Sequence, residues 1–94
     1  MIVVRNIFVA KPGNASKLAT QLKSAAVAGN MPKHRVLTDL TGDYNRVILE
    51  IEVDNISGFE AQMQNYATND ALKAALKGYT ELWVSGSREL LQVS

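Results

Sequence analysis

The segment from Lys33 to Val53 constrains the fold most, because its charges fix the register of a β-hairpin. Two alternating runs flank Gly42-Asp43, a dipeptide suited to a two-residue type II′ turn. Pairing about this turn puts opposite charges together on one sheet face: Asp39 with Arg46, Arg35 with Glu50, and Lys33 with Glu52. The other face receives an apolar layer of Val36, Thr38, Leu40, Val47, Leu49, Ile51 and Val53. A one-residue slip would move charges into that layer, so the pattern predicts a single register.

The composition is typical of a small soluble protein. With 94 residues, 47% hydrophobic and 20% charged, residues 1–94 are expected to form one domain. The net charge of +1 is spread along the chain, which argues against nucleic acid as a partner, since phosphate binding needs a concentrated basic surface. There is no cysteine, no signal-peptide pattern and no run long enough to span a membrane. We therefore expect a cytoplasmic protein that binds no membrane.

The N-terminal part predicts a strand and then a helix. Residues 2–10 are rich in Val, Ile and Phe, as strands are. Apolar residues then recur at helical spacing over residues 15–26, with Asn14 placed to cap the helix and Gly29-Asn30 to end it. The hairpin follows directly.

The C-terminal part repeats this order. Ser57 and Glu60 form an S-x-x-E capping box, which predicts the start of a second helix. This helix is expected to break at residues 68–70, and Ser87–Val93 is predicted to be the last strand, after a connection that contains Trp83. The order β-α-β-β-α-β predicts an α+β ferredoxin-like sandwich, in which helices cover one face of a four-stranded antiparallel sheet.

The sheet face away from these helices is too apolar for an idle solvent surface. Besides its charge pairs it is expected to carry Leu37, Tyr44, Ile48, Val3, Ile7 and Val9, arranged around Arg5. A second copy of the sheet would cover it, because two-fold dimers pair one patch with itself. The prediction is a homodimer through this open face. The alternative is a monomer with a partly solvated face.

Several short motifs carry a family resemblance: Lys11-Pro12-Gly13 after the first strand, Asp43-Tyr44-Asn45 before Val47-Ile48-Leu49-Glu50, Phe59-Glu60 in the second helix, and the closing Ser85-Gly86-Ser87-Arg88-Glu89-Leu90. With them the chain resembles the dimeric α/β-barrel superfamily, above all its antibiotic-biosynthesis-monooxygenase-like and NIPSNAP-like domains. The resemblance implies a barrel of two facing sheets, with a small pocket between sheet and helices in each subunit.

The resemblance also bears on activity. In the resembled monooxygenases, a polar residue of the first strand and an aromatic residue or histidine of the helices act on an oxygen-reactive substrate without a separate cofactor. Asn6 matches the first of these by position. Haem-degrading members need a helix histidine as ligand, and neither predicted helix has one.

The side chains expected on the helix-covered side are the candidates for a site, because small-molecule pockets combine apolar walls with a few polar groups. Candidate catalytic residues are Asn6, His34 and Trp83, and candidate ligand-binding residues are Phe8, Thr38, Asn45, Tyr66 and Tyr79. The imidazole of His34 is a group suited to general acid–base catalysis. The alternative is structural: the aromatic residues belong to the core, and Asn6 bonds a neighbouring backbone group.

Other site types find no support in the residues. There is no P-loop, dinucleotide-binding glycine motif or nucleophile elbow. Residues 46–52, the third strand, are acidic and lack the stacking rings of an RNA-binding sheet. A single histidine and no cysteine predict no metal site, and no cofactor is predicted.

Three hypotheses follow. The leading one is a homodimer that binds a small, mostly apolar or aromatic molecule between sheet and helices. The second is a cofactor-independent monooxygenase acting on a small aromatic or quinone-like substrate. The third is a structural or partner-binding module whose interior is filled.

Overall fold

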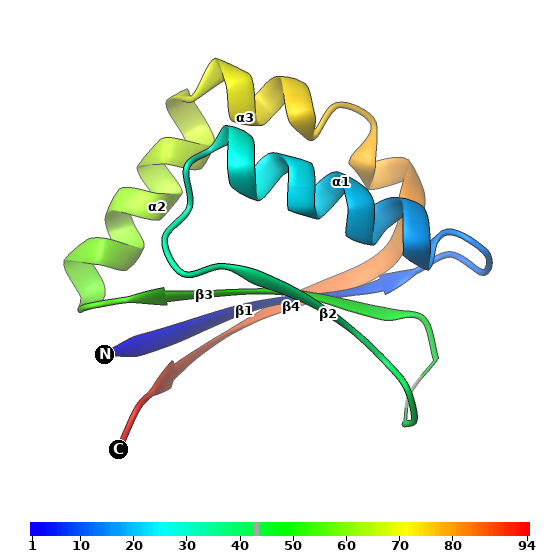
Figure 1. Ribbon diagram of the computed structural model, residues 1–94, viewed down its shortest axis with the longest axis horizontal. Helices are drawn as coiled ribbons and strands as arrows, with labels where there is room; N and C mark the ends of the chain where they lie inside the picture. Colours follow the sequence, from blue (N-terminus) through cyan, green and yellow to red (C-terminus); the bar gives the residue numbers. More distant parts are fainter. Residues whose placement is uncertain (43) are drawn as a thin grey trace.

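A computed structural model describes residues 1–42 and 44–94 of the chain. The elements occur in the predicted order (Figure 1): β1 (Ile2–Ala10), α1 (Ala15–Ala28), β2 (Arg35–Thr38), β3 (Arg46–Val53), α2 (Ile56–Thr68), α3 (Asp70–Ala75), the 3₁₀ turn η1 (Tyr79–Leu82) and β4 (Trp83–Gln92). The second helix is broken in two, as predicted. Asn69 Oδ1 accepts a hydrogen bond from the backbone N–H of Leu72 at 3.0 Å and so caps α3.

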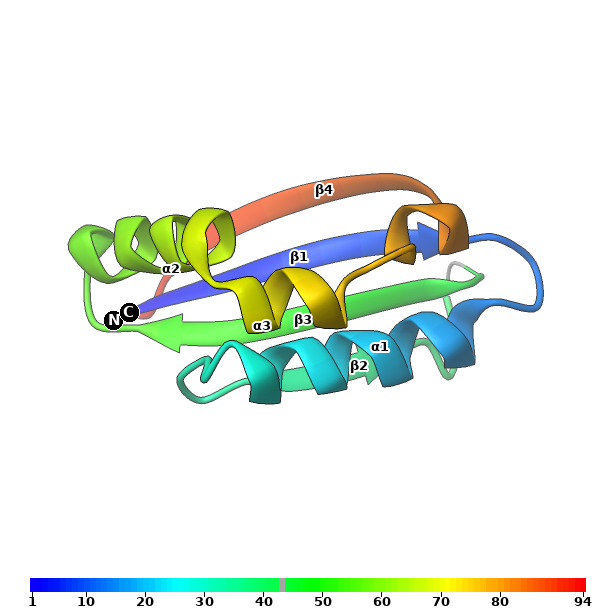
Figure 2. The ribbon, with the colours of Figure 1, turned by 90° about the horizontal axis from the view of Figure 1, so that it is seen from above.

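The strands form one four-stranded sheet in the order β2-β3-β1-β4, with every neighbouring pair antiparallel. The helices all lie on the same face of this sheet (Figures 1 and 2). Each β-α-β half therefore crosses over one intervening strand, which gives the predicted ferredoxin-like α+β sandwich.

The hairpin has the predicted register. Arg35 pairs with Glu50 and Thr38 with Val47 across β2 and β3. The predicted charge pairs are formed: Arg35 Nη2 to Glu50 Oε1 at 2.7 Å, Arg46 Nε to Asp39 Oδ1 at 3.1 Å, and Lys33 Nζ to Glu52 Oε2 at 3.8 Å. Alternation and charge thus determine the same pairing.

The end of the hairpin departs from the prediction. The ladder stops at Thr38, and Leu40, expected in the apolar layer, is 99% exposed. The carboxylate of Asp39 accepts a hydrogen bond from the backbone N–H of Arg46, so a side chain bridges the strands where a ladder bond would continue. The chain beyond is loop, and strand alternation no longer sets which way Leu40 points. The predicted type II′ turn includes Asp43, which lies outside the described residues.

Other boundaries also shift. Helix α2 begins at Ile56, and its cap is Asn55, whose Oδ1 accepts from the backbone N–H of Gly58 at 3.0 Å. The capping box predicted at Ser57 is therefore wrong, because the extended backbone of Asn55 already supplies the capping acceptor. Strand β4 begins at Trp83, earlier than predicted.

The core lies between the sheet and α1. Buried residues form two clusters: Ala10, Leu18, Ala19, Leu22, Ala26, Val47 and Leu49 in one, and Ile2, Val4, Ile51 and Val53 in the other. Helix α2, in contrast, contributes no buried residue. Its Phe59 packs, partly buried, against the second cluster, so this helix fills only part of the space beneath it. None of the helices that the structure describes is long and apolar enough to cross a membrane.

Candidate functional site

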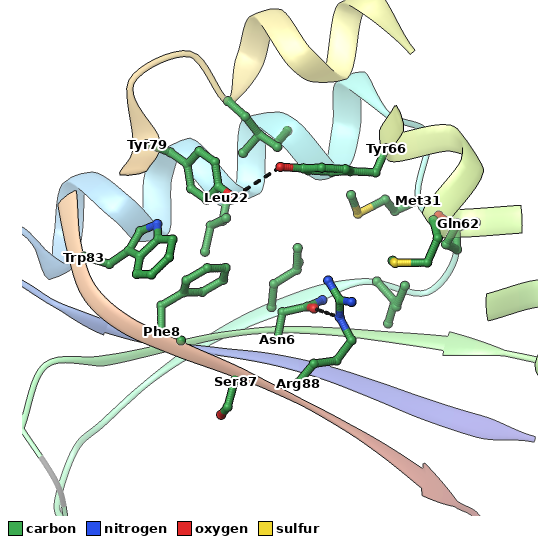
Figure 3. A pocket seen from close by; sticks show the side chains of 16 residues that line it. Asn6, Phe8, Leu22, Met31, Gln62, Tyr66, Tyr79, Trp83, Ser87 and Arg88 are labelled. Carbon is green, nitrogen blue, oxygen red and sulfur yellow. Dashed lines mark hydrogen bonds between the residues drawn. The ribbon is translucent and has the colours of Figure 1, made fainter. Parts of the chain in front are cut away.

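A cavity of about 390 Å³ lies between the helices and the sheet. Its wall draws on α1, α2, η1 and the C-terminal end of α3, and on β1, β3 and β4 of the sheet (Figure 3). Small residues help to leave it open, since Ala25 of α1 and Gly86 of β4 both line it. A side chain at Gly86 would point at the ring of Phe8, with its Cβ 3.5 Å from Cδ1. Because Gly86 has no side chain, the space beside Phe8 remains part of the cavity.

Three rings gather at one end of the cavity, as Figure 3 shows. The ring centroids of Phe8 and Trp83 are 5.5 Å apart, and Tyr79 lies 6.1 Å from each. The ring of Tyr79 meets Phe8 edge to face, with an interplanar angle of 84°. We call Phe8, Tyr79 and Trp83 the aromatic cluster. It offers an apolar, polarisable wall to a flat ligand.

A polar pair faces the cavity from the sheet. Asn6 of β1 and Arg88 of β4 are partners in the strand register, and Arg88 Nε donates to Asn6 Oδ1 at 2.7 Å. The guanidinium carbon of Arg88 also lies 5.9 Å from the ring centroid of Phe59. In Figure 3 the guanidinium points from β4 into the space below the helices. Two neighbours thus orient the guanidinium, and both are uncharged.

A pair of tyrosines adds hydroxyl groups to the wall. The Oη atoms of Tyr66 and Tyr79 are 3.3 Å apart. Burial, together with the hydrogen bond to Tyr66, raises the pKa of Tyr79 to about 12. The Tyr79 hydroxyl therefore stays protonated at neutral pH, where it can donate a hydrogen bond but cannot serve as a base.

Two buried polar atoms of the wall have no hydrogen-bond partner among the described residues. They are Trp83 Nε1, a donor, and Gln62 Oε1, an acceptor. Most buried polar atoms in proteins are paired. A ligand group that formed a hydrogen bond with either atom would therefore be bound more tightly. The cavity wall thus favours a ligand with polar groups as well as apolar surface.

The structure brings together only part of the predicted set. Asn6, Phe8, Tyr66, Tyr79 and Trp83 all line the cavity. His34, Thr38 and Asn45 do not. His34 is exposed, with Nδ1 3.0 Å from the backbone oxygen of Met31, which lies in the loop between α1 and β2.

The other two lie at the far end of the hairpin. Thr38 and Asn45 line a separate hollow beside the β2–β3 loop. Asn45 has a positive φ of 64°, so the regular alternation that placed it on the covered face does not hold there. None of these three residues lines the cavity that contains Asn6.

Arg88 is the residue that sequence reasoning missed. Ser87–Val93 was expected to be a strand, but its register against β1 depends on a contact between residues far apart in the chain. The available signal was Asn6, a polar residue in an apolar strand, since such a group needs a partner across the sheet. No metal-binding group of three or more His, Asp or Glu side chains occurs in residues 1–42 and 44–94.

Comparison with known proteins supports the fold. No family model and no curated protein matches this chain. Among solved structures, a NIPSNAP family protein from Agrobacterium tumefaciens matches with a TM-score of 0.84 at 13% identity, covering 99% of this chain and 92% of the other. A NIPSNAP domain protein from Burkholderia xenovorans matches with a TM-score of 0.82 at 15% identity, covering 100% and 95%.

The second resembled group matches as well. An antibiotic biosynthesis monooxygenase-like protein from Chloroflexus aurantiacus has a TM-score of 0.74 at 15% identity, and the match covers 99% of this chain and 92% of the other. The chain has the fold of both groups. The resemblance noted in the sequence is thus confirmed for the fold, and identities this low show the fold alone.

Proposed function

We propose that this protein binds a small, mostly apolar or aromatic molecule in the cavity between sheet and helices. The observation that carries the proposal is a cavity of about 390 Å³ with the aromatic cluster at one end and the Asn6–Arg88 pair facing it from the sheet. Ligand sites are usually clefts of roughly 300–1,000 Å³ with apolar walls and a few polar groups that set orientation.

The cavity favours this function over a structural module with a filled interior. Helix α2 packs Phe59 against the core, but its apolar side chains Met63 and Tyr66 lie on the cavity side. A purely structural helix would be expected to bury such groups, since burial of apolar surface is the main source of stability. These side chains line a space instead.

A direct test uses nuclear magnetic resonance with a panel of small benzene derivatives added to isotope-labelled protein. The expected result is that shift changes concentrate on the cavity wall, including the backbone amide of Gly86. The variant Gly86→Val should abolish binding, because its branched side chain would occupy space beside Phe8. A matched control, Ser16→Val, places the same side chain at an exposed position of α1 and should leave binding unchanged. Shift changes scattered over the surface would contradict the proposal.

The proposal includes a homodimer formed through the open face of the sheet. None of the described helices covers this face (Figure 1), yet Val3, Ile7 and Ile48 on it are apolar and only half-buried. A second copy would cover these side chains, as the two sheets of a barrel do. Light scattering should give the mass of a dimer for the wild type and of a monomer for Ile48→Asp. A control on α1, Val27→Asp, should remain dimeric.

A second candidate is a cofactor-independent monooxygenase, favoured by the Asn6–Arg88 pair, which could stabilise an oxyanion of a deprotonated substrate. The balanced reaction is R₂CH₂ + O₂ → R₂C=O + H₂O, in which the substrate supplies all four electrons that reduce O₂. The protonated Tyr79 cannot take the first proton, so this chemistry requires a substrate with an acidic C–H bond. Oxygen uptake with anthrone tests it: Asn6→Ala and Trp83→Phe should each slow turnover about tenfold or more. Equal rates in both variants and the wild type would eliminate this candidate.

A further inference from the structure

One charged side chain stands out among those that line the cavity. Of the described lining residues, Arg88 alone is charged at neutral pH, and no Asp or Glu is among them. A cavity with a single cationic group favours an anionic guest, because a charged acceptor forms a stronger hydrogen bond with a guanidinium than a neutral one does. The positive charge of Arg88 therefore indicates a negatively charged ligand.

The other arginines show what distinguishes Arg88. Arg5 and Arg35 both bind the carboxylate of Glu50, and Arg46 binds Asp39. Arg88 has no carboxylate partner within the described part of the chain. Its partners are the neutral amide of Asn6 and the ring of Phe59, which orient the guanidinium without neutralising it. Only Nε is used, so the terminal nitrogens make no hydrogen bond to any described residue.

From this we infer that the ligand is an aromatic carboxylate, with its acid group on Arg88 and its ring against the aromatic cluster. This inference rests on the proposed binding function. A planar guanidinium forms paired hydrogen bonds with a carboxylate, and these are stronger than bonds between neutral groups.

The strand register sets the distance between the two ends of this ligand. Asn6 pairs with Arg88, and Phe8 pairs with Gly86, so the polar row and the aromatic row are adjacent on the covered face. Residues two apart in a strand are roughly 7 Å apart. A ring with a carboxylate attached directly or through one or two carbons spans such a distance. The hydroxyl of Tyr79 at the aromatic end is uncharged and does not repel an anion.

The test compares carboxylates with their neutral amides: benzoate, phenylacetate and 3-phenylpropanoate against the three matching amides. Trp83 is the only tryptophan, so its fluorescence reports on the cavity directly. We expect at least one carboxylate to bind the wild type about tenfold or more tightly than its amide. In Arg88→Gln the affinity for the carboxylate should fall to that for the amide, while the affinity for the amide should change less than about twofold. Arg88→Lys keeps the charge but loses the planar guanidinium, so its affinity for the carboxylate should lie between those of the wild type and Arg88→Gln.

A charge-matched control excludes a general effect of net charge. Lys17→Gln removes the same charge from an exposed position of α1 and should keep the preference for carboxylates. If carboxylates and amides bind the wild type equally, the inference is wrong while the proposed binding function stands. The inference is equally wrong if Arg88→Gln keeps the preference. If no member of either series binds in the cavity, both this inference and the proposed function fail.

Discussion

Arginine side chains have different partners on the two faces of the sheet. On the open face, Glu50 is only 5% exposed although none of the described helices covers it, because the side chains of Arg5 and Arg35 lie against it with hydrogen bonds of 2.9 and 2.8 Å. On the covered face, Arg88 has no acidic partner among the described residues. A carboxylate supplied by the chain makes an ion-pair network around Glu50, whereas Arg88 is the arginine that we propose pairs with a ligand.

The largest expected effect comes from breaking the network on the open face. Glu50→Gln removes a nearly buried carboxylate and leaves Arg5 and Arg35 to repel each other. Losing one partner of a buried ion pair costs several kcal/mol, but both arginines are partly exposed, so we expect a loss of about 2 kcal/mol in the free energy of unfolding. Urea denaturation at fixed protein concentration measures this value. A loss below about 0.5 kcal/mol would show that the network is not structural.

Substitutions on the covered face should instead change the affinity for a ligand. Phe8→Leu removes one ring of the aromatic cluster and keeps an apolar side chain, so an aromatic probe should bind about fivefold to tenfold more weakly. The neighbouring residue provides the control, because Ile7 lies on the open face of the same strand. Titration calorimetry on Ile7→Leu should give wild-type affinity. Equal losses in the two variants would contradict the division of roles between the faces.

The acid stability of the protein tests the same network by another route. Burial alone would raise the pKa of Glu50, but the hydrogen bonds from Arg5 and Arg35 outweigh it, so its pKa is lowered from 4.5. A carboxyl with a lowered folded-state pKa contributes stability above its unfolded pKa, and this contribution is lost as the pH falls through the folded value. Urea denaturation from neutral pH to below pH 4.5 should therefore show a steeper loss in the wild type than in Glu50→Gln. Parallel curves would contradict this account.

The smallest effect sharpens the contrast. Arg88→Gln should change the free energy of unfolding by less than about 0.5 kcal/mol, because the side chain is exposed and forms no ion pair with any described residue. Thermal unfolding of this variant beside Glu50→Gln gives the comparison directly. If both substitutions destabilise the protein equally, Arg88 is a structural residue.

The sequence predicted the fold well where the determining signals are local. Alternation and three charge pairs within one hairpin were enough to predict the observed register. The predictions failed where regular alternation ended, as at Leu40, and where two capping residues competed, as at Asn55 and Ser57. The physical reason is that caps and loops depend on a few backbone angles, which periodicity does not describe.

The candidate site was predictable only in part. Strand alternation placed Asn6 and Phe8 on the covered face, and helical spacing drew attention to Tyr66 and Tyr79. The partner of Asn6 depends on how β4 pairs with β1, a contact between the two ends of the chain. The cavity itself depends on how far α2 stands from the sheet. Hydrophobic spacing indicates which face of a helix turns inward, but not how closely that face packs.

The central claim is that the covered face holds an aromatic carboxylate between Arg88 and the aromatic cluster. A crystal structure of the protein with the tightest-binding carboxylate of the series tests it most directly. The predicted result is a carboxylate within hydrogen-bond distance of the Arg88 guanidinium and a ring packed against Phe8, Tyr79 and Trp83. A carboxylate bound at the open face, or one that lies in the cavity with its acid group turned away from Arg88, would contradict it.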